Sequence, residues 1–399
     1  MSSISMYIHV PFCMHRCGYC DFNTYAGLDA LIPAYTQAVC REIELLSSGV
    51  NGRLPIGTIY LGGGTPSLLP ITDLEKILLT VSKYFQLDKS PEISIEANPG
   101  TLTETFLVIL RSLGVNRLSL GMQSANQFEL KLLDRQHSFE DVVNAVAWAR
   151  AAGFNNLNLD LIFGLPFQRL STWMANLETA LSLQPEHLSL YALSIEMGTP
   201  LYNKVKAGIL HETDQDHVAD MYETATERLA DAGYFQYEIS NWTRVDQNGE
   251  QYSCKHNLQY WRNLPYLGVG AGAHGFINHQ RTVNVSTPGE YIKRLDFGSM
   301  GSGGINGFPC TPATLQITPI DVDTEISETM MMGLRLVSEG VSHFEFERRF
   351  GMSLRERFTT QIERLIRYSL LEWAGEEMEF LRLTQKGRLL GNQVFKEFI

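Results

Sequence analysis

The sequence has few cysteines, no excess of basic residues and no long hydrophobic run. Its 399 residues include only 6 cysteines, and the net charge is −12. A protein that binds duplex nucleic acid normally shows a basic surface, so the acidic balance argues against a nucleic-acid partner. No segment approaches the roughly 20 consecutive apolar residues that a membrane-spanning helix needs. The N-terminus has neither a basic region nor an apolar leader, so we expect a cytoplasmic protein without a transmembrane segment.

A repeated pattern occupies the first half of the chain. Short apolar runs are each followed by a turn and then by a segment of helical period. The runs begin at Ser5, Gly57, Glu92, Asn116, Leu157 and His187, and the clearest helical segments are 34–47, 71–85, 139–152 and 170–183. Serial β-α units predict a parallel sheet with helices outside it, and both an open doubly wound sheet and a partial barrel fit. The unusual residues stand at the carboxyl ends of the runs, where such folds form ligand sites.

The pattern changes after the sixth unit. We expect a core domain over residues 1–235, a segment rich in glycine, aromatics and histidine with a linker over 236–312, and a C-terminal domain over 313–399. The linker is the Gly/Ser-rich stretch 296–312. The C-terminal stretch reads as two or three helices with a β-wing, so we predict a mostly helical, winged-helix-like domain.

Half of the cysteines lie in "CMHRCGYC", as Cys13, Cys17 and Cys20. In a reducing compartment, clustered cysteines are more often metal ligands or redox centres than disulfides. A structural zinc ion normally has four ligands, and the only nearby candidates for the fourth are His9 and His15. The other alternative is a disulfide between two of these cysteines, with the third thiol free. Three thiolates at this spacing favour an iron–sulfur cluster, and three ligands on a [4Fe–4S] cube leave one iron open.

These motifs together resemble a known family. The blocks "YIHVPFC…RCGYCDF", "GGGTPSLL", "IEANPG", "RLSLGMQS", "NLDLIFGLP" and "HNLQYW" are similar to the HemN/HemW-like branch of the radical S-adenosylmethionine (SAM) enzymes. The resemblance runs from Tyr7 to the C-terminus. It implies a partial (β/α)6 barrel, a [4Fe–4S] cluster held by the three clustered cysteines, and a SAM that chelates the open iron. One electron from the cluster would then split SAM to a 5′-deoxyadenosyl radical.

The resemblance also implies which residues bind SAM. They are Tyr7, Tyr19, Gly63, Gly64, Thr65, Glu96, Gln123, Arg135, Asp160 and Ala192. The glycines would let the backbone approach the methionine ammonium, and the carboxylates suit the cationic and hydroxyl groups of SAM. Taken singly, some of these residues have a plainer explanation: a tight turn at the glycines, a helix N-cap at Asp160, and a solvated surface charge at Arg135.

Two departures separate the chain from one member of this branch, anaerobic coproporphyrinogen III dehydrogenase. That enzyme has a further cysteine two residues after the third ligand, where this chain has Phe22, and it has an extension before the motif, where this chain has 12 residues. Both departures are shared with heme chaperones of the branch. The resemblance therefore implies a chaperone that binds heme and passes it to an acceptor protein, with a SAM-cleaving oxidoreductase of porphyrin biosynthesis as the alternative. Transient association with a membrane through the acceptor is compatible with this interpretation.

Heme needs an axial ligand and an apolar pocket. The segment "CKHNLQYWRNLPYLGVGAGAHG" offers His256, Cys254, Tyr260 and Trp261, with His274 further on. We predict His256 as the axial ligand because it heads the family block. The plainer interpretation is that His256 only makes hydrogen bonds within the fold.

Overall fold

The computed structural model describes residues 3–50, 52–296 and 307–399. Its contacts divide the chain into two compact units: residues 1–225 with 265–318, and residues 226–264 with 319–399. The expected segment 236–312 is thus shared between the two units. Most of the expected linker lies outside the described residues.

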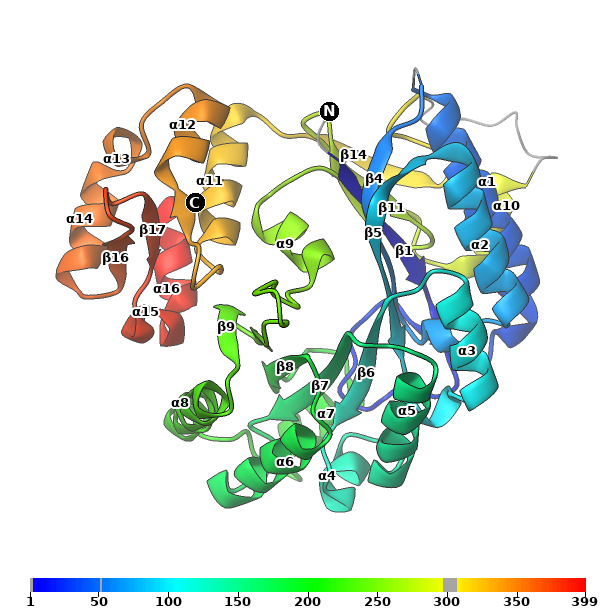
Figure 1. Ribbon diagram of the computed structural model, residues 1–399, viewed down its shortest axis with the longest axis horizontal. Coiled ribbons are helices and arrows are strands. Elements are labelled where there is room, and N and C mark those ends of the chain that lie inside the picture. The colour runs from blue at the N-terminus through cyan, green and yellow to red at the C-terminus, as the bar shows by residue number, and fades with distance from the viewer. Residues whose placement is uncertain (1–2, 51, 297–306) are drawn as a thin grey trace. The chain divides into compact units, whose positions relative to one another are not determined.

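A mixed sheet forms the centre of the first unit (Figure 1). Its strands are β1 (Ile4–Val10), β4 (Pro55–Gly63), β5 (Gln86–Ala97), β6 (Arg117–Gln123), β7 (Leu157–Phe163), β8 (His187–Ala192), β11 (Tyr266–Val269), β12 (His274–Ile277), β13 (Gln280–Asn284) and β14 (Thr314–Pro319). They lie in the order β14-β13-β12-β11-β1-β4-β5-β6-β7-β8. The run from β11 through β1 to β8 is parallel, whereas β12 pairs antiparallel with β11 and β13. All six predicted strands are present, and β11 is a parallel strand that the repeated pattern did not predict.

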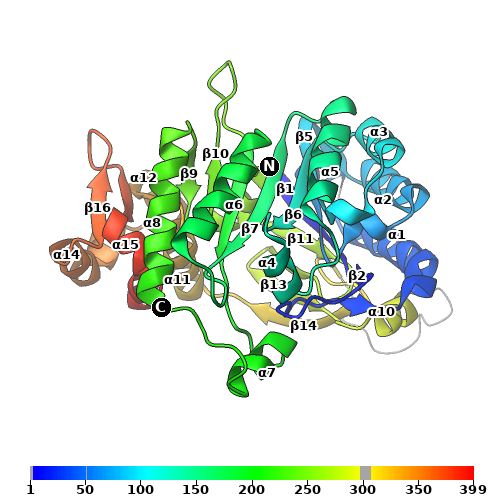
Figure 2. The same ribbon diagram turned by 90° about the horizontal axis from the view of Figure 1, so that it is seen from below.

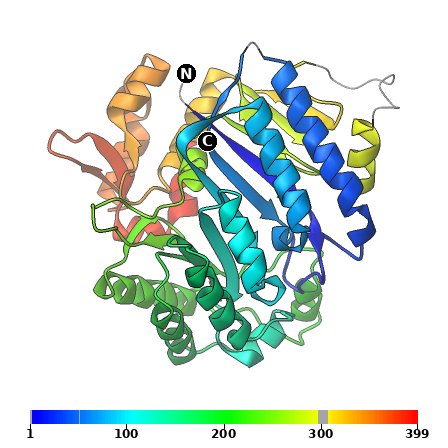
Figure 3. The ribbon, with the colours of Figure 1, turned by 45° about the vertical axis from the view of Figure 1, so that its right-hand side comes forward.

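Helices cover the outer face of this sheet (Figures 1 and 2). They include α1 (Ile32–Ser48), α2 (Ile71–Tyr84), α3 (Glu104–Ser112), α4 (Gln127–Leu132), α5 (Phe139–Ala151), α6 (Leu170–Ser182), α8 (Gln215–Asp231) and α10 (Pro288–Leu295). Helix α7 (Pro200–Lys206) lies apart from this face (Figure 2), and its Leu201 amide donates to the Gly18 carbonyl at 2.8 Å. Figure 3 shows α1, α2 and α3 side by side on that face. Local sequence sets their starts: Ser138 and Asp141 form a capping box that begins α5.

Strand residues alternate between an apolar and a polar face. Residues such as Leu61, Ile95 and Leu118 are fully buried. The alternate positions carry polar side chains, and the register places Glu96 beside Ser119 and Ser119 beside Asn158. Successive side chains of a strand point to opposite faces. One face of the sheet therefore packs against helices, and the other is a polar inner face that leads to the carboxyl ends of the strands.

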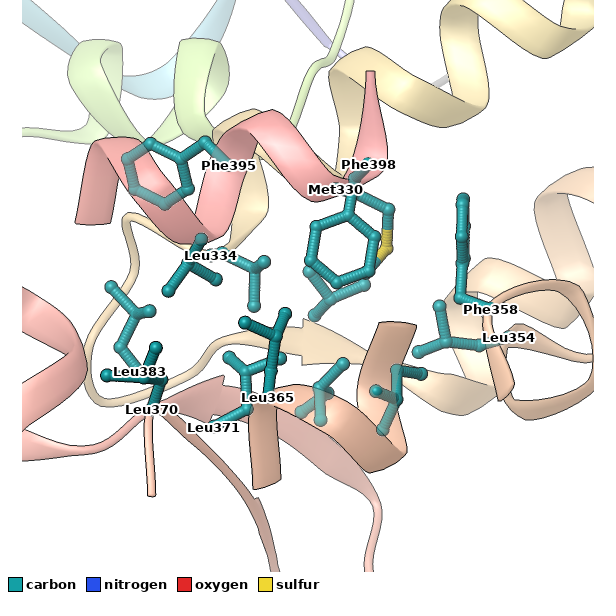
Figure 4. Packing of buried hydrophobic residues seen from close by; sticks show 14 of the residues in the cluster. Met330, Leu334, Leu354, Phe358, Leu365, Leu370, Leu371, Leu383, Phe395 and Phe398 are labelled. Carbon is teal, nitrogen blue, oxygen red and sulfur yellow. The ribbon is translucent and has the colours of Figure 1, made fainter. Parts of the chain in front are cut away.

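The second unit has its own hydrophobic core. Its elements are β9 (Phe235–Glu238), β10 (Asn241–Thr243), α9 (Lys255–Trp261), α11 (Val322–Gly333), β15 (Val341–Ser342), α12 (His343–Phe350), α13 (Leu354–Arg357), α14 (Thr359–Arg367), β16 (Leu371–Ala374), β17 (Phe380–Leu383), α15 (Gln385–Leu389) and α16 (Gly391–Phe395). Strands β16 and β17 form the predicted wing, with β15 beside β17. Figure 4 shows Met330, Leu334 and Phe398 meeting in the core between these elements.

Candidate cluster and cofactor site

The three clustered cysteines lie in a loop that starts at the carboxyl end of β1. Strand β2 (Phe12–Cys13) pairs with β3 (Tyr25–Ala26) and closes the base of this loop. All six cysteines are free, and burial raises the pKa of Cys13 and of Cys20, to which the neighbouring thiols contribute. Thiolates at these positions would repel one another, and the positive charge of a bound metal cluster would relieve that repulsion.

Two residues from outside the loop contact these thiols: Thr65 follows β4, and Arg135 follows α4. The Thr65 hydroxyl lies 3.7 Å from Cys13 Sγ, and Arg135 Nη1 lies 3.5 Å from Cys17 Sγ. Arg135 also donates from Nη2 to the Gly121 carbonyl at 3.0 Å. Arg135 is therefore not a solvated surface charge, and its guanidinium faces the sulfur that a cluster would bind.

No zinc site is apparent at the loop. Across residues 3–50, 52–296 and 307–399, no three histidine, cysteine, aspartate or glutamate side chains come close enough to hold a single metal ion. His9 is engaged elsewhere, since its Nε2 donates to the Asn23 carbonyl and its Nδ1 accepts from the Tyr7 hydroxyl, both at 2.9 Å. His15 instead pairs with Asp134 at 2.8 Å.

The glycine turn after β4 is packed against β1. A Cβ on Gly63 would lie 2.4 Å from the His9 ring, and one on Gly64 would lie 2.6 Å from the Phe12 carbonyl oxygen. Gly63 also has φ of +113°, a conformation that other residues rarely adopt. The backbone amides of Gly64 and Thr65 donate to Val10 and Phe12. These glycines are thus required by the fold itself, and their role toward SAM stays a prediction.

Two carboxylates stand on the inner face near this turn. Glu96 accepts from the Tyr60 hydroxyl at 2.9 Å and from the Gly63 amide at 3.0 Å. Asp160 accepts from Ser119 at 3.0 Å and from Asn158 at 2.8 Å, so it lies within β7 and caps no helix. Desolvation by burial raises the pKa of Glu96 to about 7 and raises that of Asp160. The two carboxyls also repel each other, so a cationic ligand between them would be stabilised.

The remaining predicted residues lie at the same edge of the sheet. Gln123 ends β6 with φ of +62°, a strained backbone of the kind that clusters at functional sites. Tyr19 packs against the apolar group Leu133, Ile162 and Leu165. Ala192 is the exposed last residue of β8 and pairs with Phe163.

His256 lies in the second unit, on α9. It is 1% exposed, and its Nε2 lies 2.9 Å from the Tyr260 hydroxyl one helical turn further on. The rings meet edge to face with centroids 5.0 Å apart. An iron at Nε2 would have to replace the Tyr260 hydroxyl, so the axial role of His256 stays a prediction.

One group of positioning residues escaped the sequence analysis. The backbone of Gly270 and Ala271, just after β11, is held largely by side chains. The Gly270 amide donates to Glu42 and the Ala271 amide donates to Tyr35, each at 2.8 Å; Asn284 and Asn23 donate to the two carbonyls, each at 3.0 Å. Asn23 belongs to the cysteine loop, so this turn anchors the loop. The glycine-rich "GVGAGAHG" was a signal, because glycines mark close backbone approaches.

Comparisons with known proteins identify the family of this chain. A model of the Radical SAM superfamily matches residues 7–180, and a model of the HemN C-terminal domain matches residues 320–390. The chain is 38% identical to the heme chaperone HemW of Bacillus subtilis over 397 residues, which cover 99% of each protein. It is 34% identical to the heme chaperone HemW of Lactococcus lactis, over 99% of this chain and 97% of that one.

The chain belongs to the HemW family. Its fold is also that of coproporphyrinogen III oxidase (HemN) from Escherichia coli, with a TM-score of 0.82 at 22% identity over 99% of this chain and 90% of that structure. The predicted radical SAM fold with a C-terminal domain is therefore confirmed. Among the described helices of this HemW-family protein, none is long and apolar enough to cross a membrane.

Membership of the radical SAM superfamily implies a [4Fe–4S] cluster and SAM. The residues present fit both groups. Three free thiols share one loop beside a guanidinium, and two buried carboxylates with raised pKa values face the inner side of the same strand ends.

Proposed function

We propose that this protein is a heme chaperone that holds a [4Fe–4S] cluster and exchangeable SAM and passes heme to an acceptor protein. The observation that carries the proposal is the similarity to heme chaperones over the whole chain, at 38% identity and 99% coverage of both proteins. Phe22 supports it, because this exposed side chain stands where the dehydrogenase has a further cysteine.

Each part of the site would have its own task. Cys13, Cys17 and Cys20 would hold the cluster, which when bound supplies one electron to SAM. Arg135 would offset the negative charge of the ligating thiolates, since it already contacts Cys17. Glu96 and Asp160 would face the cationic and hydroxyl groups of SAM. The glycine turn, Gln123, Tyr7, Tyr19 and Ala192 would complete the SAM site.

Heme would bind through the second unit, with His256 as axial ligand. Neutral imidazole is a common ligand of heme iron. Tyr260 would release Nε2 of His256 when the iron arrives and hold the ring in place when heme leaves. Such an exchange suits a heme carrier, because the hydrogen bond to Tyr260 would stabilise His256 when no heme is bound.

The alternative is an oxidoreductase that acts on coproporphyrinogen III, and the intact set of cluster and SAM residues favours it. Both functions can be assayed together on anaerobically reconstituted protein with SAM and a reductant. We expect heme transfer to apo-myoglobin and no vinyl products from coproporphyrinogen III. Formation of vinyl products without heme binding would establish the alternative.

The axial ligand is tested in the same assay. We expect His256→Ala to shift the Soret band and to speed heme loss, whereas His274→Ala, on the exposed start of β12, should do neither. Wild-type spectra and off-rates for His256→Ala would move the assignment to Cys254, the buried residue before α9.

A further inference from the structure

Arg335 in the second unit has an unusual environment. It follows α11, and its guanidinium lies 4.6 Å from the centroid of the Trp261 ring and 5.8 Å from that of Phe395. The side chain is half-buried, and its Nε is buried without a hydrogen-bond acceptor. Among the described residues, none pairs with this guanidinium as a carboxylate or accepts a hydrogen bond from it.

Two other arginines of the same unit have carboxylate partners. Arg262, the neighbour of Trp261 in sequence, pairs with Glu339 at 2.7 Å, and Arg349 pairs with Glu325. A guanidinium carries five N–H donors, and leaving such donors unpaired in a buried place is costly. Buried polar groups without partners are rare and call for a specific explanation. The missing acceptor at Arg335 therefore points to a ligand.

Further polar atoms around Arg335 lack partners. Trp261 Nε1 is buried without an acceptor, and Glu238 Oε2 is buried without a donor. Glu238 is close enough for Arg335 to lower its pKa, yet the two form no ion pair among the described contacts. Desolvation raises the pKa of Glu238 to about 7, so near neutrality much of it is uncharged and leaves the positive charge of Arg335 available.

The position of Trp261 relates this environment to heme. Trp261 ends α9, five residues after His256, which corresponds to about 7.5 Å along the helix axis. Heme combines a central metal with carboxylates at one edge of a flat aromatic ring. An arginine on an indole ring, at the end of the short helix that carries His256, supplies a cation for the charged edge of this ligand.

We infer that Arg335, stacked on Trp261, binds a propionate carboxylate of heme. The inference rests on the proposed function and adds a residue that recognises the charged edge of the ligand. Guanidinium and carboxylate form two parallel hydrogen bonds, and the indole face keeps the guanidinium in orientation. Nε of Arg335 would gain the acceptor that it lacks in the protein alone.

The test compares heme with heme dimethyl ester, in which both propionates are esterified. Equilibrium titration of the full-length protein is followed by the Soret band. We expect the wild type to bind heme roughly tenfold to a hundredfold more tightly than the ester, the range for a charge-assisted hydrogen-bonded pair. Arg335→Gln should lose this preference while its affinity for the ester stays unchanged, and Arg335→Lys should keep part of it.

Arg262→Gln is the matched control, since it removes the neighbouring arginine and should keep the full preference. Retention of the preference by Arg335→Gln would overturn the inference and leave the proposed function standing. If Arg335→Gln fails to fold, as judged by circular dichroism, an unchanged preference in Arg335→Lys would overturn it instead. If the wild type bound neither heme nor its ester, the proposed function would fall, and the propionate site with it.

Discussion

At the scale of single residues, the candidate SAM site is governed by charge that the fold has removed from water. Glu96 and Asp160 both have raised pKa values, for which desolvation is the first cause. Tyr60 and the Gly63 amide hold Glu96 in place, and Ser119 and Asn158 hold Asp160. The carboxyls are thus oriented before any ligand arrives.

Glu96 should make SAM binding depend on pH. Its pKa of about 7 lies above the ordinary value, so the free protein carries a neutral Glu96 below pH 7 and a carboxylate above it. A cationic ligand prefers the carboxylate, so binding below pH 7 requires loss of a proton. We expect the affinity for SAM to fall by up to about tenfold per pH unit below 7 and to level off above 7.

Equilibrium binding of SAM to reconstituted protein between pH 5.5 and 8.5 measures this dependence. Glu96→Gln should bind more weakly at pH 8 and should lose the slope below pH 7. A slope that persists in Glu96→Gln would assign the proton to another group, such as Asp160.

Single residues also show what could be predicted from sequence. The cysteine motif and Arg135 stand in the blocks of the resemblance, and the structure brings Arg135 to Cys17. The hydrogen-bond partners of the two carboxylates are Tyr60, Ser119 and Asn158. They were not predicted, because the prediction considered only residues at the ends of the strands. These residues occupy alternate positions further back on the strands, where only period-two polarity of the inner face would have revealed them.

At the scale of elements, helix α1 connects the cysteine loop to the turn after β11. Tyr35 and Glu42 are seven residues apart and lie on one face of α1. Glu42 accepts from Gly270, Asn284, Tyr291 and Thr311, at 2.6–2.9 Å. Tyr35 donates to the His9 carbonyl at 2.8 Å. The helix therefore fixes both the end of β1 and the turn on which Asn23 rests.

Glu42→Gln should disturb the cysteine loop. The glutamine side chain has an NH2 group in place of one carboxylate oxygen. This group cannot accept the hydrogen bonds that the oxygen accepted, which should cost roughly 2 to 4 kcal/mol of unfolding free energy. We also expect faster loss of the reconstituted cluster on exposure to a chelator, followed by its visible absorbance.

Asn116→Ala is the matched control for this variant. Asn116 bonds Ile93 and Pro91 at 2.9 and 2.8 Å, at the amino end of β6, the opposite edge of the sheet from the cysteines. It should lower stability without changing the rate of cluster loss. Equal rates of cluster loss in both variants would show that Glu42 has only a general structural role.

Elements differ in how far the sequence predicts them. The parallel strands and their helices follow from alternation and helical period, as in α2, predicted at 71–85 and found at Ile71–Tyr84. Strand β11 was missed because glycines interrupt its apolar run, and its place beside β1 depends on long-range pairing. The stretch after Ser353 reads as one amphipathic helix but breaks at Phe358 into α13 and α14. Phe358 is buried in the core of the second unit, a tertiary contact that periodicity does not reveal.

At the scale of the whole molecule, the chain consists of two units with separate cores. The boundaries of residues 226–264 could not be predicted, because the change of composition after the sixth unit does not show which unit this part of the chain joins. The returning chain places α9 with the C-terminal elements and β11 with the sheet, and only the contacts of the folded chain show this.

Separate cores predict separable effects on stability and on the cluster. Leu334 is fully buried beside Met330 and Phe398, so Leu334→Ala should cost about 2–5 kcal/mol in the unfolding of the second unit. Denaturant unfolding of the full-length protein measures this loss, and cluster content should remain that of the wild type. Leu161→Ala, equally buried in β7, should instead lower cluster content. Loss of the cluster in Leu334→Ala would contradict the separation.

The central claim is that this protein carries heme and gives it up to another protein. The most direct measurement mixes the heme-loaded protein with an apo-globin and follows the Soret band of each partner over time. The account predicts uptake of one heme per chain and its transfer to the globin, faster from His256→Ala than from the wild type. Failure of the wild-type protein to take up heme, or retention of heme in the presence of excess apo-globin, would contradict it.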